Sequence, residues 1–288
     1  MRVAHGLHSE ADDELSVHLA WQRLLPAQGS FTHLTGARLR GWWLPPLPED
    51  LPVWLGMGRN DVRPDRAGVR TIRLAANANH DVLDGLRVAA AEELLLACAR
   101  DLGLLDLVVL IDAALHSGDL DLDDLRRAAD QRRRGAPALR SAIPFAHPKS
   151  ESAWETLLRV FHVVCQIHVE PQHELLVDDH VIARGDLWLV GTNVFHEYDG
   201  SDHLKRRQQV KDLRRARRLD EQSIVRHGYT SEDLLQRGVS ILRDADRSVG
   251  RAHDPSRVRA WHALLRESLF TPAGMSRMRV LWRLAPAA

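Results

Sequence analysis

The chain has 288 residues, of which 44% are hydrophobic and 27% are charged. That apolar fraction excludes a wholly disordered chain, and the length predicts two domains. The 39 basic residues balance the 39 acidic residues, so the net charge gives no sign of a nucleic-acid partner, and such a partner would need a local basic patch.

Cysteine content and hydropathy indicate where the protein resides. Cys98 and Cys165 are too few for a disulfide framework or a thiolate zinc site, and they fit a reducing cytoplasm. The N-terminal residues are acidic and lack a long apolar core, so we expect no signal peptide. The longest apolar stretch, 102–115, contains Asp106 and Asp112 and is too short and too charged to span a bilayer. We therefore expect a cytoplasmic protein that does not enter a membrane.

The first half of the chain is predicted to form a mixed, mainly helical domain. Four prolines between residues 45 and 52 exclude a helix there. The last expected helix begins at a capping Asp121 or Asp123 and ends at three arginines, which suits the helix dipole. Propensity and apolar spacing predict helices over 16–25, 35–43, 89–102, 104–115 and 121–133, and strands over 53–55 and 69–74.

A change of composition separates the two halves. Pro137 follows the arginine-rich helix end, and Pro144 and Pro148 predict a connector. We therefore place a boundary between a first domain, residues 1–145, and a second domain, residues 146–288.

The second half predicts an α/β core in the order helix, three strands, helix and strand. Ser152 is a suitable N-cap, and Glu155 stands three residues later, which is the capping-box spacing. Thr230 or Ser231 opens a further helix, and residues 238–288 are expected to add one or two helices without an assigned function. Apolar spacing predicts a helix over 157–164, strands over 174–177, 181–190, 194–198 and 222–225, and a basic helix over 202–219.

Acidic side chains are predicted to face one another across a β-hairpin of this half. A tight turn at Gly191-Thr192 places Asp186 directly opposite Glu197, and such facing side chains have Cβ atoms ~4.5–5.5 Å apart. Asp199 shares the face of Glu197, because side chains alternate along a strand. Carboxylates this close repel one another, so the pattern predicts a positive charge between them.

A divalent cation would supply that charge. Mg2+ and Mn2+ prefer carboxylate and water oxygens, and they neutralise charge that develops on a phosphodiester. Asp186 and Glu197 are therefore the candidate metal ligands, and Glu155 on the preceding helix completes the acidic set. The alternative is a solvated acidic face on which Arg184, beside Asp186, neutralises one carboxylate.

Three short patterns occur in order along this half. They are Ser-x-x-Glu-x-x-x-Arg at 152–159, Arg-x-Asp at 184–186 and Glu-x-Asp-Gly-x-x-His at 197–203. From about Lys149 to Leu235 the chain resembles the PD-(D/E)xK nuclease superfamily, and within it an uncharacterised bacterial group related to very-short-patch-repair endonucleases. The resemblance implies a restriction-endonuclease-like αβββαβ core that hydrolyses DNA with Mg2+.

The resemblance also implies a role for each matching position. Asp186 matches the strand aspartate that bridges the metal ion and the scissile phosphate, and Glu197 matches the second acidic ligand. Glu155 matches the helix glutamate of the core. His203 matches a histidine of this group that would act as a general acid or base.

One position departs from the superfamily. Asp199 stands where most members have a lysine two residues after the glutamate, a substitution that the resembled group shares. The charge-stabilising role therefore passes to His203, Lys205 or Arg184.

A concentrated run of basic residues follows the acidic patterns. Residues 205–218 carry eight lysines and arginines against a single acidic residue, Asp212. On a helix four of the eight form one continuous stripe that can follow a phosphate backbone, although a solvated helix paired with acids elsewhere is the alternative. The candidate nucleic-acid-binding residues are Arg184, Lys205, Arg207, Lys211, Arg214 and Arg218.

The first half carries a weaker resemblance. The segment 31–41, together with 85–88 and the helices up to Arg134, resembles the N-terminal regions of AbiEi-type antitoxins. This implies a regulator with a protein partner, although no full winged helix-turn-helix is evident at the start of the chain.

Three functional hypotheses follow. The first is a Mg2+- or Mn2+-dependent DNA endonuclease. The second is a non-catalytic DNA-binding or antitoxin-like regulator on a degenerate nuclease scaffold. The third is a structural partner protein that binds neither metal nor DNA.

Overall fold

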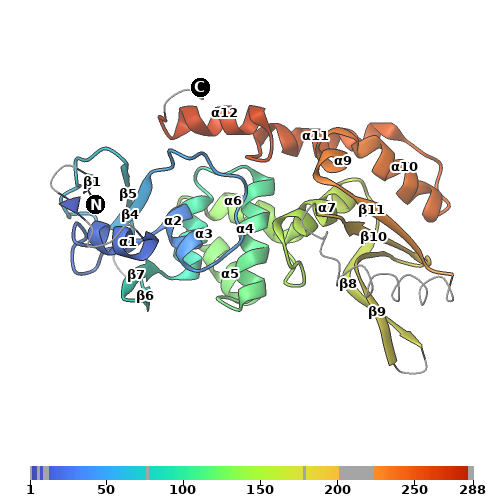
Figure 1. The fold of residues 1–288 in the computed structure, drawn as a ribbon, viewed down its shortest axis with the longest axis horizontal. Helices are drawn as coiled ribbons and strands as arrows, with labels where there is room; N and C mark the ends of the chain where they lie inside the picture. The colour runs from blue at the N-terminus through green and yellow to red at the C-terminus, as the bar shows by residue number, and fades with distance from the viewer. Residues whose placement is uncertain are drawn as a thin grey trace.

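The computed structural model describes residues 2–4, 7–8, 13–75, 78–177, 180–200 and 223–284. The protein is a mixed α+β molecule with one large sheet in each half of the chain and helices between and above them (Figure 1).

The first half is built on a five-stranded sheet in the order β5-β4-β3-β7-β6. Its strands are β3 (Ser30–Phe31), β4 (Val53–Met57), β5 (Val69–Arg73), β6 (His80–Leu83) and β7 (Leu86–Ala89), and a separate pair is formed by β1 (Arg2–Ala4) and β2 (Leu7–His8). Its helices are α1 (Glu14–Gln22), α2 (His33–Leu39), α3 (Ala91–Cys98), α4 (Leu104–Ser117), α5 (Leu122–Asp130) and α6 (Ala136–Ala142), followed by the 3-10 turn η1 (Ile143–Phe145).

The expected helices and strands of this half are confirmed, with ends shifted by up to a few residues, but β1, β2, β3, β6, β7 and α6 were not predicted. The β6–β7 hairpin turns at Asp84 and Gly85, whose φ angles are 48° and 80°. Asp-Gly between apolar strands is a strong signal for such a turn. The sequence analysis overlooked it.

The second half contains a four-stranded sheet in the order β11-β10-β9-β8. β8, β9 and β10 are antiparallel neighbours, whereas β10 and β11 are parallel. The helix expected between β10 and β11 falls in residues 201–222, outside the described residues. The described elements are α7 (Ala153–Val164), β8 (Val169–Val177), β9 (His180–Leu189), β10 (Val194–Tyr198) and β11 (Val225–Tyr229).

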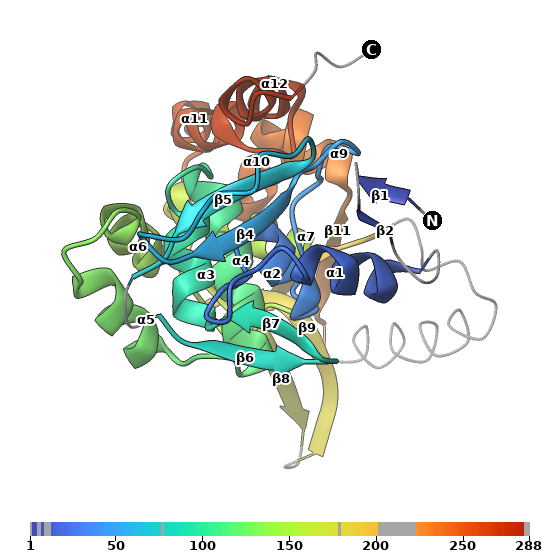
Figure 2. The ribbon, with the colours of Figure 1, turned by 90° about the vertical axis from the view of Figure 1, so that its left-hand side faces the viewer.

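The helix expected to open at Thr230 or Ser231 is present, and the described residues after it form three α-helices rather than the expected one or two. The last two run back over the first half, as both views show (Figures 1 and 2). There the Trp282 ring lies edge-on to Trp54 at 5.3 Å, and Arg279 pairs with Asp50 at 2.8 Å. The elements are α9 (Ser231–Gln236), α10 (Gly238–Ser248), the 3-10 turn η2 (Pro255–Arg257), α11 (Val258–Glu267) and α12 (Pro272–Leu281).

Helix α4 is the centre of the molecule. Every residue from Leu105 to Leu115 is buried, as expected for a helix that other elements surround. None of the helices in the described ranges is long and apolar enough to cross a membrane. Asp106 and Asp112, the two aspartates that interrupt this apolar stretch, are buried together with it.

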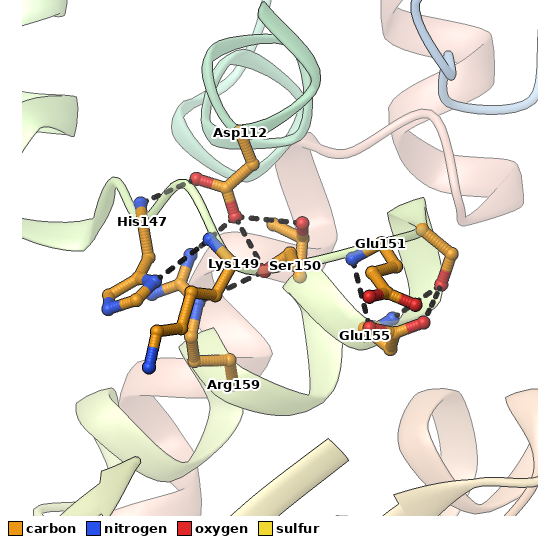
Figure 3. A network of polar contacts seen from close by, with 9 residues as sticks. Asp112, His147, Lys149, Ser150, Glu151, Glu155 and Arg159 are labelled. Atoms are coloured by element: carbon orange, nitrogen blue, oxygen red, sulfur yellow. Dashed lines mark hydrogen bonds and ion pairs between the residues drawn. The ribbon is translucent and has the colours of Figure 1, made fainter. Parts of the chain in front are cut away.

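Asp112 joins α4 to the second half (Figure 3). Its carboxylate accepts hydrogen bonds from the backbone N–H of His147 at 2.8 Å and the hydroxyl of Ser150 at 3.0 Å. It also accepts from the Thr156 hydroxyl at 2.8 Å and the Arg159 guanidinium at 2.6 Å. The Asp112 and Arg159 side chains are 0% and 5% exposed. One buried carboxylate thus holds the connector and the first turns of α7.

Replacing Asp112 by Ala should destabilise the protein strongly. The change leaves the Arg159 guanidinium buried without its countercharge, which costs about 3–5 kcal/mol. The double variant Asp112→Leu with Arg159→Met should lose less unfolding free energy than Asp112→Ala, because no buried charge remains. Urea denaturation measures both. Asp123→Ala, which breaks an exposed pair with Arg126, is the control and should cost under about 1 kcal/mol. Equal losses for Asp112→Ala and the control would contradict the assignment.

Asp106 joins α4 to the C-terminal helices. Its carboxylate accepts from the Ser268 hydroxyl at 2.5 Å and from the backbone N–H of Leu269 at 2.9 Å. Burial raises the pKa of Asp106 to about 7, and the two hydrogen bonds only partly oppose that effect.

This raised pKa predicts a pH-dependent stability. The folded state holds the Asp106 proton more tightly than the unfolded chain, so the contribution favours folding at low pH and is lost as the pH rises through 7. Asn at this position does not titrate. Between pH 4 and 7 the unfolding free energy of the wild type should therefore fall by about 3 kcal/mol relative to Asp106→Asn. Urea denaturation across this range measures the difference, and parallel pH profiles would refute it.

Candidate functional site

The hairpin register is the one that the sequence predicted. Phe195 lies opposite Trp188 and His196 lies opposite Leu187, so Glu197 comes next in line with Asp186. The Asp186 carboxylate reaches across the hairpin and accepts the backbone N–H of Tyr198 at 2.9 Å. The two acids therefore belong to one small region between β9 and β10.

Glu155 reaches the same region from the first turn of α7. Ser152 caps this helix, as predicted, and its hydroxyl donates to Oε1 of Glu155 at 3.0 Å. Oε2 accepts the backbone N–H of Glu151 and the side-chain amide of Gln172, both at 2.9 Å. Burial and the negative charge of Asp186 raise the pKa of Glu155. Glu155 is thus close to Asp186, as expected, but three donors already hold its carboxylate.

The positive charge beside these acids comes from Arg226 on β11. Its guanidinium pairs with the carboxylate of Glu197, a residue that is only 5% exposed. Burial lowers the pKa of Arg226, and the charge of Asp186 acts in the opposite direction. Arg226 was not predicted as a site residue, because the expected strand ended at residue 225.

Asp199 lies at the open end of β10. Its backbone N–H donates to the carbonyl of Tyr229 at 2.9 Å, and its carboxylate rests against Gly228. A Cβ atom at Gly228 would meet that carboxylate, so the Asp199 side chain would have to turn away if Gly228 were replaced. Asp199 itself is exposed.

Arg184 extends from β9 toward the connector. It pairs with Glu151 at 2.8 Å, and both side chains are largely exposed. Such a pair contributes little to stability. Arg184 therefore binds an acid just before α7.

The remaining predicted site residues lie outside the described part of the chain, and their roles stay predictions. Within the described ranges, no group of three or more histidine, cysteine or acidic side chains is arranged to hold a metal ion. A hard cation needs several oxygens turned toward one point. Here the Glu197 carboxylate is turned to Arg226, so the described part of the site presents an ion-paired acid instead of a preformed ligand set. The predicted site residues that lie outside the described ranges are His203, Lys205, Arg207, Lys211, Arg214 and Arg218.

A buried chain of polar side chains beside this site was not predicted. His162 Nδ1 lies 2.7 Å from the Leu158 carbonyl and therefore donates, which leaves Nε2 to accept from Nδ1 of His196 at 2.9 Å. The Tyr229 hydroxyl lies 3.5 Å from His196 and 3.3 Å from Asp244. Burial lowers the pKa of His162 to about 4 and that of His196 to about 2. Both rings are therefore neutral at pH 7. The chain of contacts connects α7, β10, β11 and α10.

Comparisons with known proteins leave the family open. No family model and no curated protein matches the chain. Among solved structures, the crystal structure of the RV2827C protein from Mycobacterium tuberculosis matches with a TM-score of 0.35 and 17% identity, over 59% of this chain and 67% of that chain. A likeness of this size does not identify a family.

Replacing Arg226 should show how the acids depend on it. Arg226→Gln removes the positive charge next to the buried Glu197 and should cost about 2–4 kcal/mol. Adding Glu197→Gln should restore part of that loss, which gives a coupling energy above about 1 kcal/mol. A double-mutant cycle by urea denaturation measures the coupling, with the exposed pair Arg126–Asp123 as the matched control. Additive effects at Arg226 and Glu197 would refute the pairing.

Proposed function

We propose that this protein is a non-catalytic nucleic-acid-binding protein on a nuclease-like scaffold. The observation that carries the proposal is the ion pair between Glu197 and Arg226. A metal-dependent nuclease uses such a carboxylate to hold its cation. Here the carboxylate is engaged by a guanidinium of the same sheet, so the arrangement keeps the acids neutralised without a metal ion.

The nuclease-like scaffold is part of the proposal. The order α7, β8, β9, β10 and then β11, with a parallel β10–β11 pair, supports an αβββαβ core. We propose residues 146–288 as this nuclease-like domain and residues 1–145 as an antitoxin-like domain that contacts a protein partner.

The nucleic-acid partner is inferred from the basic run 205–218. This run links β10 to β11, the two strands that carry Glu197 and Arg226. Lysine and arginine bind DNA chiefly by neutralising phosphates and releasing counterions. The proposed DNA-binding run thus directly joins, in sequence, the two strands that carry the ion pair.

A Mg2+- or Mn2+-dependent endonuclease is the second candidate. It is favoured by the closeness of Glu155 and Asp186, since the charge of Asp186 raises the pKa of Glu155. In this candidate Asp186 and Glu197 would hold the ion after Arg226 releases Glu197, and the ion would neutralise charge on the phosphodiester.

DNA binding and DNA cleavage, measured on the same preparations, separate the two candidates. We expect the wild type to retard duplex DNA in a gel, with no cleavage in Mg2+ or Mn2+. Asp186→Ala should bind as the wild type does, as should the exposed control Asp123→Ala. The variant with glutamine at the four stripe positions should bind more weakly, and the slope of log K against log salt should shrink by about 3–4. The stripe positions are Arg207, Lys211, Arg214 and Arg218.

Two results would overturn the proposal. Divalent-dependent cleavage that Asp186→Ala abolishes and Asp123→Ala retains would establish the endonuclease instead. Absence of DNA binding by the wild type would remove both candidates and favour the structural partner.

A further inference from the structure

An arginine-lined hollow opens in the first half of the chain, away from the acidic site. It measures about 950 Å³ and lies where the end of α3 meets the turn between α5 and α6. Its lining contains more basic than acidic residues, although the charges of the whole chain cancel. The charged residues of the lining are Arg100, Arg132, Arg133, Arg134, Arg140, Asp101 and Asp130.

The turn that carries three of these arginines is held against α3 by two contacts. Gly135 has a φ of 92°, and a Cβ atom there would collide with the carbonyl oxygen of Leu96. Glycine therefore allows the turn to lie directly on α3. Arg133 then binds the buried Glu93 in a two-pronged ion pair, with Nη2 2.6 Å from Oε2. The backbone of the turn that carries Arg132 and Arg134 is thus held against α3.

Two of the arginines keep their charge unpaired among the described residues, and a third has an unsatisfied N–H group. Arg132 and Arg134 make no hydrogen bond or ion pair with the described residues, and both are exposed. The Nε of Arg100 is buried and has no acceptor in the described part of the chain. Burial lowers the pKa of Arg100, and the positive charges of Arg133 and Arg134 lower it further. The hollow therefore gathers guanidinium groups that repel one another.

The acids of the lining relieve this repulsion only in part, because Asp101 raises the pKa of Arg100 but burial and the neighbouring arginines outweigh that effect. Asp101 accepts the indole N–H of Trp282 at 3.1 Å and lies 3.4 Å from Nε2 of His33, so its carboxylate is turned to the core. Asp130 makes no ion pair with the described residues. A ligand with several negative charges would satisfy the arginines that the fold leaves unpaired.

We propose that this hollow binds an oligophosphate through Arg100, Arg132 and Arg134. Guanidinium groups bind phosphate oxygens with two parallel hydrogen bonds, and a chain of phosphates offers several such sites within a short length. The volume lies in the range of small-ligand pockets. No aromatic side chain is found among the described lining residues, so the phosphates carry the recognition. This site goes beyond the proposed function and does not depend on it.

Isothermal titration calorimetry of the full chain with inorganic tripolyphosphate tests the site at constant ionic strength. We expect saturable binding at one site per chain. The double variant Arg132→Glu with Arg134→Glu, at two exposed positions, should bind at least tenfold more weakly, and Arg100→Gln should weaken binding in the same direction. Arg259→Glu, at an exposed position on α11, is the matched control and should bind as the wild type does.

Two further titrations identify the source of the phosphates. Tighter binding of ATP than of tripolyphosphate indicates a nucleotide, and equal binding indicates a phosphate chain alone. Displacement of tripolyphosphate by duplex DNA, lost in the double variant, indicates a nucleic-acid backbone. Absence of saturable binding, or an equal loss in Arg259→Glu and in the double variant, would overturn the proposal. If Arg100→Gln fails to fold, the double variant alone decides.

Discussion

The arrangement of the whole molecule depends on a carboxylate inside its most apolar helix. Asp112 is buried in α4 and receives hydrogen bonds from the connector and from α7, including the Arg159 guanidinium. A buried charge is tolerated only when such partners satisfy it, so the contacts must form together or not at all. Asp106, two helical turns earlier, fixes the C-terminal helices in the same way. Glu155 is positioned by α7, and therefore ultimately by α4.

Local patterns were enough to predict much of this fold. The Ser152 cap, the hairpin register around Gly191 and the helices of the first half follow from spacing and capping rules that act over a few residues. The aspartates of α4 show where such rules end. In the sequence they appear as charges that interrupt an apolar stretch, because their partners lie up to 163 residues away. Only the packed structure brings those partners together.

The acidic site shows the same limit in its chemistry. The sequence predicted that Asp186 and Glu197 need a nearby positive charge, and one is present. Electrostatics specifies the sign of that charge but not its source, and a guanidinium from β11 meets the requirement as well as a metal ion does. Arg226 was not predicted because the expected strand ended one residue before it, and because β10 and β11 are parallel strands from segments that are far apart in the sequence. The proposed roles of the acids therefore turn on a strand pairing between distant segments.

The return of the C-terminal helices to the first half has a consequence for biosynthesis. The rings of Trp54 and His33 are covered by Trp282, which lies near the end of the chain. While the chain is being made, that part of the N-terminal core stays open to water until the α12 segment has left the ribosome. Domains usually fold one after another as they emerge, but here one patch of the first half is covered only by a segment that is synthesised much later. Until then, the rings of Trp54 and His33 are an apolar surface to which chaperones can bind.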